Sequence, residues 1–178
     1  MLFRSSAELS ESINSMHDWY SHSNICYAYL ADVDDEDNPE RSQSQFRESR
    51  WFSRAWTLQE LISPRIVIFL SKDWRVVGTK SSLARTIQEV TNIDVDVLLG
   101  RRKLSEVCVA KRMSWAARRE AGKVEDEAYS LLGIFGIYLP LNYGEGRNAF
   151  IRLQEAIMKD IPDQTLFAWG SQIGRAHV

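Results

Sequence analysis

The chain has 178 residues, of which 44% are hydrophobic and 26% charged, and its formal net charge is −2. These values are typical of a folded globular protein and exclude disordered, collagen-like and strongly basic classes. Two cysteines and three histidines are too few for a disulfide framework or a structural zinc site, and reduced thiols favour a cytoplasmic protein. The most apolar run, residues 131–141, is far shorter than the roughly 20 residues that span a bilayer. We therefore expect no membrane association.

A helix, a strand and a loop are expected first along the chain. Ser5 and Glu8 have the spacing of a capping box, and the helix that follows should end near Tyr20. Its apolar face comprises Leu9, Ile13, Met16 and Tyr20. Residues 25–33, rich in Tyr, Ile and Leu, predict a strand. Residues 34–44 are polar and acidic and contain Pro39, which indicates an exposed loop.

The stretch from residue 49 to residue 70 predicts a central helix followed by a strand. Ser49 can cap the helix and Pro64 forbids its continuation, so about three turns fit between them. One face of this helix is a core-facing stripe formed by Trp51, Ala55, Leu58 and Ile62. The apolar residues 65–70 then predict a buried strand.

A second strip on the same predicted helix carries the candidate site. Phe52, Trp56 and Glu60 are spaced four apart, so a continuous helix places a carboxylate against two aromatic rings. Such a strip can disfavour water and offers a flat surface to a ring-shaped ligand. The plainer interpretation is an interfacial Glu60 that pairs with Arg54 or Arg65.

Beyond residue 70 the pattern is mostly helical. Residues 76–78 predict a short strand, and residues 78–81 lack the glycine spacing that a phosphate-binding loop requires. A helix from about Ser105 should bury Val109 and Met113. Four basic residues are expected on its solvent-exposed face: Lys111, Arg112, Arg118 and Arg119. Two further helices are expected after residue 125, and residues 166–170 suggest either a short last strand or a segment that packs on the core.

The order of elements predicts the fold class. Helix–strand–helix–strand with nearly continuous apolar strands indicates a parallel α/β sheet flanked by helices, with the strands at 25–33 and 65–70 adjacent. Only four residues precede the first helix, whereas a doubly wound sheet needs a strand there, so the chain is expected to be a fragment. Residues 173–178 resemble the translation of a common sequencing adapter. Residues 171–178 are therefore interpreted as an artefact.

Several blocks of the chain resemble one family. Residues 54–61, Arg-Ala-Trp-Thr-Leu-Gln-Glu-Leu, resemble the Arg-Gly/Ala-Trp-Thr-Leu-Gln-Glu signature of the fungal heterokaryon-incompatibility (HET) domain. Blocks in the same order as in that family occur at residues 6–11, 26–33, 112–116, 125–133 and 143–146. The resemblance implies that residues 1–71 are the C-terminal part of a HET domain and residues 72–170 a mostly helical HET-associated region. It also implies a role in non-self recognition that triggers programmed cell death.

The HET domain in turn resembles TIR domains, where a Trp-Cys-x-x-Glu-Leu helix carries the glutamate needed for NAD cleavage. Trp56 and Glu60 match that Trp and Glu, with Thr57 in place of the Cys. The resemblance implies a truncated TIR-like (flavodoxin-like) sheet, with Glu60 catalytic and Trp56 and Phe52 binding the substrate. NAD would be the substrate, with no cofactor and no metal, and the site should open toward the carboxyl ends of the strands. The fragment by itself is expected to be inactive.

A second hypothesis is a non-catalytic signalling module. In this interpretation the chain self-associates and responds to an unknown upstream recognition partner. Glu60 is then structural or interfacial. A third function, nucleic-acid binding through residues 101–119, is not expected. The basic residues there are not interleaved with aromatic ones, and the isoelectric point is near 6.0.

Overall fold

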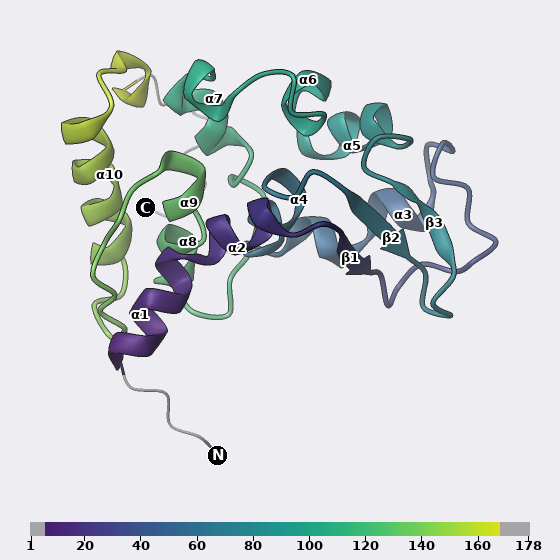
Figure 1. Ribbon diagram of the computed structural model, residues 1–178, viewed down its shortest axis with the longest axis horizontal. Helices are drawn as coiled ribbons and strands as arrows, with labels where there is room; N and C mark the ends of the chain where they lie inside the picture. The colour runs from purple at the N-terminus through teal and green to yellow at the C-terminus, as the bar shows by residue number, and fades with distance from the viewer. Residues whose placement is uncertain (1–5, 168–178) are drawn as a thin grey trace.

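The protein is described here by a computed structural model, which covers residues 6–167. A small three-stranded sheet lies at one end of the molecule and a group of helices fills the other (Figure 1). This is a mixed α/β fold. The predicted cap at Ser5, the second half of the predicted strand at 166–170, and residues 171–178 lie outside the described residues.

The regular elements follow one another closely along the chain. The strands are β1 (Cys26–Tyr29), β2 (Val67–Leu70) and β3 (Val76–Thr79). The α-helices are α1 (Ser6–Asn14), α2 (Met16–His22), α3 (Gln45–Glu48), α4 (Thr57–Ile62), α5 (Ala84–Thr91), α6 (Val95–Leu98), α7 (Val109–Ser114), α8 (Asp126–Tyr129), α9 (Leu132–Phe135) and α10 (Asn148–Asp160). The described residues also form the 3-10 helices η1 (Arg50–Ser53), η2 (Leu104–Glu106) and η3 (Gln164–Phe167). Within residues 6–167, no helix combines the length and apolarity that crossing a membrane requires.

The strand pairing confirms one prediction and corrects another. β1 and β2 are adjacent and parallel, with Cys26 opposite Val67 and Tyr29 opposite Leu70. β3 pairs with β2 in the antiparallel direction. The predicted parallel sheet is therefore correct for β1 and β2 alone, because the turn that follows β2 is too short for the crossover that a parallel strand needs.

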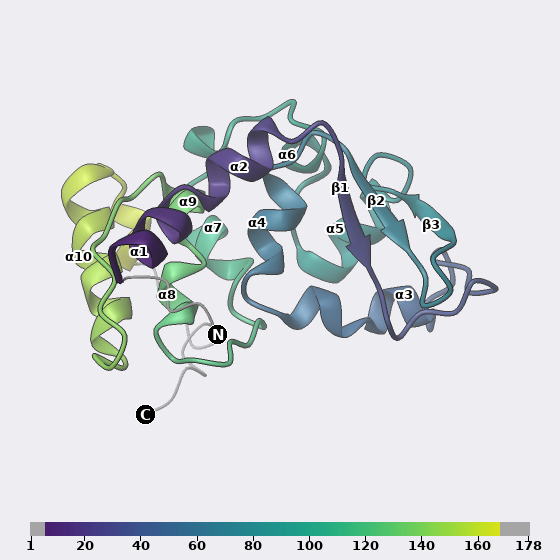
Figure 2. The same ribbon diagram turned by 60° about the horizontal axis from the view of Figure 1, so that its bottom comes forward.

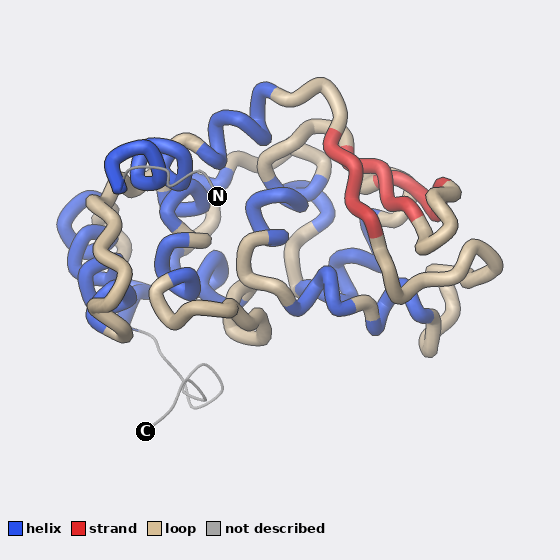
Figure 3. Tube along the Cα trace, turned by 90° about the horizontal axis from the view of Figure 1, so that it is seen from below, coloured by secondary structure: helices blue, strands red, loops and turns tan. Residues whose placement is uncertain are grey.

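Helices cover one face of the sheet. Figures 2 and 3 show α3, α4 and α5 on the same side of the strands. Ala28 is buried on that side, whereas Tyr27 and Tyr29, its neighbours in β1, are exposed. The alternation follows from the two-residue period of a strand. The helical core and the covered sheet face belong to one continuous set of buried apolar side chains.

Two predicted helices are each divided in the structure. The first breaks at Ser15, between α1 and α2, where a long-range contact holds Asn14. The Asn14 amide donates to the backbone oxygen of Leu139 at 3.0 Å and accepts from its backbone nitrogen at 3.2 Å. The helix expected after residue 125 divides into α8 and α9, and α9 ends at Gly136, which has a left-handed conformation (φ 66°). Residues 166 and 167 belong to η3, so the predicted strand does not begin there.

Candidate functional site

The helix predicted between Ser49 and Pro64 is interrupted. η1 ends at Ser53, Arg54 is extended (φ −82°, ψ 137°), and α4 begins only at Thr57. A distant segment pairs with the interruption: the backbone nitrogen of Ala55 donates to Glu120 at 2.8 Å, and that of Glu120 donates to Ser53 at 2.6 Å. The prediction of one continuous helix is therefore wrong. Backbone groups that pair with residue 120 cannot also form helical hydrogen bonds.

The interruption separates Phe52 from the other two candidate residues. Phe52 is 7% exposed and packs edge-on against Phe46 and Trp51, with ring centroids 5.2 Å apart in both pairs. Trp56 and Glu60 are both half-buried, one turn apart. Phe52 is thus part of the core beneath the sheet rather than a wall of the surface that carries Trp56 and Glu60, which speaks against the substrate-binding role expected for it.

Glu60 lies near the amino ends of the parallel strands. It is in the last turn of α4, the helix that leads into the first residue of β2. Its charge also acts on Cys26, the first residue of β1. The predicted opening toward the carboxyl ends is wrong, because a helix between two parallel strands runs antiparallel to them and ends where the next strand starts.

Two protonated groups surround the Glu60 carboxylate. Burial raises the pKa of the Tyr20 hydroxyl, and the charge of Glu60 and hydrogen bonding to it raise that pKa further. Burial also raises the pKa of the Cys26 thiol to about 11, again with a contribution from Glu60. At neutral pH both groups therefore stay protonated, so neither is a nucleophile or a general base. No ion pair in the described part of the chain joins Glu60 to Arg54 or Arg65.

Lys80 is a buried cation that sequence reasoning did not single out. Its ammonium group donates to the backbone oxygens of Leu61 (3.1 Å) and Ile62 (3.4 Å), and also to that of Pro64. These carbonyls lie at the C-terminal end of α4, where a cation is favoured. Burial lowers the pKa of Lys80 to about 8, an effect that Cys26 partly offsets. The local sequence holds no signal for this contact, because it depends on the hairpin that brings residue 80 back to α4.

Arg119 forms hydrogen bonds at the start of α4. Its Nη1 donates to the backbone oxygen of Arg54 and to the hydroxyl of Thr57, both at 2.9 Å, and its Nε donates to the backbone oxygen of Trp115 at 3.2 Å. Burial lowers the pKa of Arg119 to about 10, and the charge of Glu60 opposes that shift. Arg119 is therefore half-buried, whereas the sequence predicts a solvent-exposed side chain.

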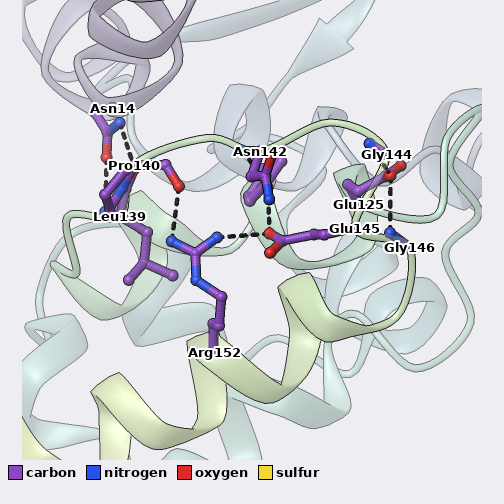
Figure 4. Close-up of polar contacts among 10 residues, drawn as sticks. Asn14, Glu125, Leu139, Pro140, Asn142, Gly144, Glu145, Gly146 and Arg152 are labelled. Atoms are coloured by element: carbon purple, nitrogen blue, oxygen red, sulfur yellow. Dashed lines mark hydrogen bonds and ion pairs between the residues drawn. The ribbon is translucent and has the colours of Figure 1, made fainter.

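A second polar cluster joins two blocks of the sequence that resemble the HET family (Figure 4). The Glu125 carboxylate accepts hydrogen bonds from the backbone nitrogens of Gly144 (2.7 Å) and Gly146 (3.0 Å). Glu145 in turn accepts from Tyr129 (2.7 Å) and pairs with Arg152 of α10 (2.6 Å). The glycines of residues 143–146 thus let backbone amides approach a carboxylate, which is a structural role.

The backbone amides lower the pKa of the Glu125 carboxyl group. A depressed pKa stabilises the fold above the ordinary Glu pKa, and the contribution is lost as the pH falls through the folded-state value. We therefore expect Glu125→Gln to be less stable than the wild type at pH 7, because glutamine keeps an acceptor but no charge. The difference should shrink below about pH 4.3. Denaturant midpoints at pH 7 and pH 3 measure it, with the exposed Glu127→Gln as control; an equal difference at both pH values would contradict it.

The chemistry available around Glu60 is limited. Its half-buried carboxylate can stabilise a positive charge or accept hydrogen bonds, with Trp56 beside it. No group of three or more His, Cys, Asp or Glu side chains in residues 6–167 is placed to hold a metal ion. A pocket of about 280 Å³ lies among η2, α7 and α9, and its lining includes neither Glu60 nor Trp56.

The sequence of the chain is similar to part of a longer known protein. Over 160 residues it is 46% identical to a Podospora anserina protein named vegetative incompatibility protein HET-E-1. That stretch is 87% of this chain and 12% of the relative, so the chain spans about an eighth of the relative's length. Residues 148–177 match the family model of a domain of unknown function (DUF8212). No solved structure matches the chain.

Proposed function

We propose that this chain is a segment of a fungal heterokaryon-incompatibility protein and takes part in non-self recognition that ends in cell death. The observation that carries the proposal is the 46% identity to HET-E-1 over 160 residues. The HET-like blocks of the sequence lie between residues 6 and 146. The activity and partners of the whole protein, including self-association and an upstream recognition partner, belong to the proposal.

Within that role, the geometry favours a signalling segment in which Glu60 is structural. Glu60 lies at the amino ends of the strands, among groups that stay protonated, and Phe52 is buried in the core. Ligand sites of α/β sheets form at the opposite, carboxyl ends. In this proposal Glu60 links α4 to Tyr20 of α2, and cell death follows from assembly rather than from chemistry at Glu60.

NAD cleavage is the second candidate function. One observation favours it: Glu60 and Trp56 are half-buried and one turn apart, so a ligand can reach both. The carboxylate would then stabilise the oxocarbenium-like transition state of glycosidic cleavage.

Glu60→Gln in the full-length protein separates the two functions. Glutamine keeps the size and one acceptor oxygen but removes the charge. In the structural proposal the variant should kill incompatible fusion cells at the wild-type rate and leave cellular NAD unchanged. Glu155→Gln, at an exposed position on α10, is the matched control. Loss of both NAD consumption and cell death at an unchanged melting temperature would instead establish Glu60 as catalytic.

A further inference from the structure

Arg112 is buried, although its position in the sequence predicts a solvent-exposed side chain. It is 4% exposed on α7. Its Nη1 donates to the backbone oxygen of Ile134 at 3.2 Å, and the guanidinium carbon lies 4.6 Å from the centre of the Phe135 ring. These contacts fix the plane of the guanidinium group against α9.

Among the described residues, the guanidinium group has no ion-pair partner. Its Nε is buried without a hydrogen-bond acceptor among the described residues, and none of their carboxylates forms an ion pair with it. Asp163 is the carboxylate that acts on it, and the oxygens of Asp163 already accept from the backbone nitrogens of Val109 and Thr165 and from the Thr165 hydroxyl. A buried cation with a free donor is costly unless an anion completes it.

A pocket opens beside this group. Arg112 lines it together with six residues of η2, α9 and the end of α10: Leu104, Ser105, Ile134, Phe135, Gly136 and Ile161. Its volume is about 280 Å³. Most of these side chains are apolar, and Ser105 is exposed. Arg101 and Arg102, which precede Ser105 in the chain, pair with Asp96 and Asp94. The pocket thus combines a buried cation with apolar walls.

We propose that this pocket binds a small organic carboxylate with an apolar body. The carboxylate accepts hydrogen bonds from the guanidinium group of Arg112, and the body lies among Leu104, Phe135 and Ile161. This is a site separate from Glu60, and the proposal does not depend on the heterokaryon-incompatibility assignment.

The composition of the pocket selects this ligand class over inorganic phosphate. A guanidinium group pairs with either anion in a planar, forked geometry. Here one nitrogen is already bonded to Ile134 and the walls are apolar. A dianion would therefore leave charge uncompensated in an apolar site, whereas a carboxylate carries one charge and its body removes apolar surface from water. The volume suits a single ring or a short branched chain.

Benzoate titration of the full chain, followed by amide chemical shifts in NMR, tests the proposal. We expect saturable shifts confined to Leu104, Ser105, the residues 134–136 and Ile161. Benzamide has the same shape without the charge and should bind at least tenfold more weakly. Inorganic phosphate should cause no saturable shift at the same positions. Equal binding of benzamide, saturable phosphate shifts in the pocket, or no saturable benzoate shift would each overturn the proposal.

Two variants locate the site. Ser105→Phe places a bulky side chain in the pocket from an exposed position of its lining, and it should abolish benzoate binding while the fold stays intact. Arg112→Met removes the cation and should abolish binding as well, whereas the exposed Arg118→Met is the matched control and should bind like the wild type. If Arg112→Met does not fold, Ser105→Phe decides. Unchanged benzoate affinity in Ser105→Phe would contradict the proposed site.

Discussion

Trp51→Ala is expected to lower the free energy of unfolding by about 3–5 kcal/mol, the typical cost of deleting a buried aromatic side chain. Trp51 is 8% exposed, and its ring meets those of Phe52 and Phe69 edge-on at centroid distances of 5.2 and 5.6 Å. These rings connect η1 to the central strand β2. Alanine would leave a cavity that rigid neighbours on both elements cannot close.

The midpoint of denaturant unfolding measures this effect, provided that the slope of the transition is unchanged. Trp19→Ala is the matched control, because Trp19 is 57% exposed on α2. Its effect should stay within about 0.5 kcal/mol. Equal effects of the two substitutions would show that Trp51 does not stabilise the junction of η1 and the sheet.

Gly133→Ala is expected to destabilise the protein by about 1–3 kcal/mol through overpacking. A methyl group at this position would lie 2.3 Å from the Cβ of His17 and 2.8 Å from the Oε1 of Gln59. His17 bonds to Ser63 at 2.7 Å, and the Gln59 amide donates to Ser130 at 2.7 Å, so neither side chain can retreat without losing a partner. The gain in helix propensity, about 0.5–1 kcal/mol, is smaller than the steric penalty.

Gly122→Ala supplies the control for this substitution. Gly122 is exposed, and an added methyl group there would meet nothing within 4 Å. Thermal unfolding of both variants compares them directly. A melting temperature of Gly133→Ala at or above that of the wild type would mean that α2 and α9 are not as closely packed as the structure indicates.

The local sequence pattern correctly predicted those parts of the fold that depend on residues close together in the sequence. The strands around Cys26 and Val67 were found from their composition, and their parallel pairing followed from the helix between them. The two apolar positions predicted to be buried after residue 105 are buried as the 3.6-residue period requires: Val109 and Met113 of α7.

The candidate site was only partly predictable. Trp56 and Glu60 lie one turn apart as their spacing required, since α4 begins directly after Trp56. The place of Phe52 could not be predicted, because the interruption before α4 depends on pairing with Glu120, more than sixty residues away. Glu60 lies at the amino ends of the strands because α4 runs antiparallel to β1 and β2. The prediction that the site opens toward the carboxyl ends did not take this direction into account.

The sequence by itself determined that the fold mixes helices with strands, that two strands are parallel and which helix faces are buried, since these follow from periodicities within short windows. Only the tertiary structure decided which charged residues are buried. Lys80 and Arg112 are both buried and bonded to backbone oxygens of another segment, although the sequence predicts an exposed Arg112. A buried cation is stabilised by hydrogen-bond acceptors that the fold brings to it. These acceptors are distant in the sequence, so the residues around the cation do not predict them.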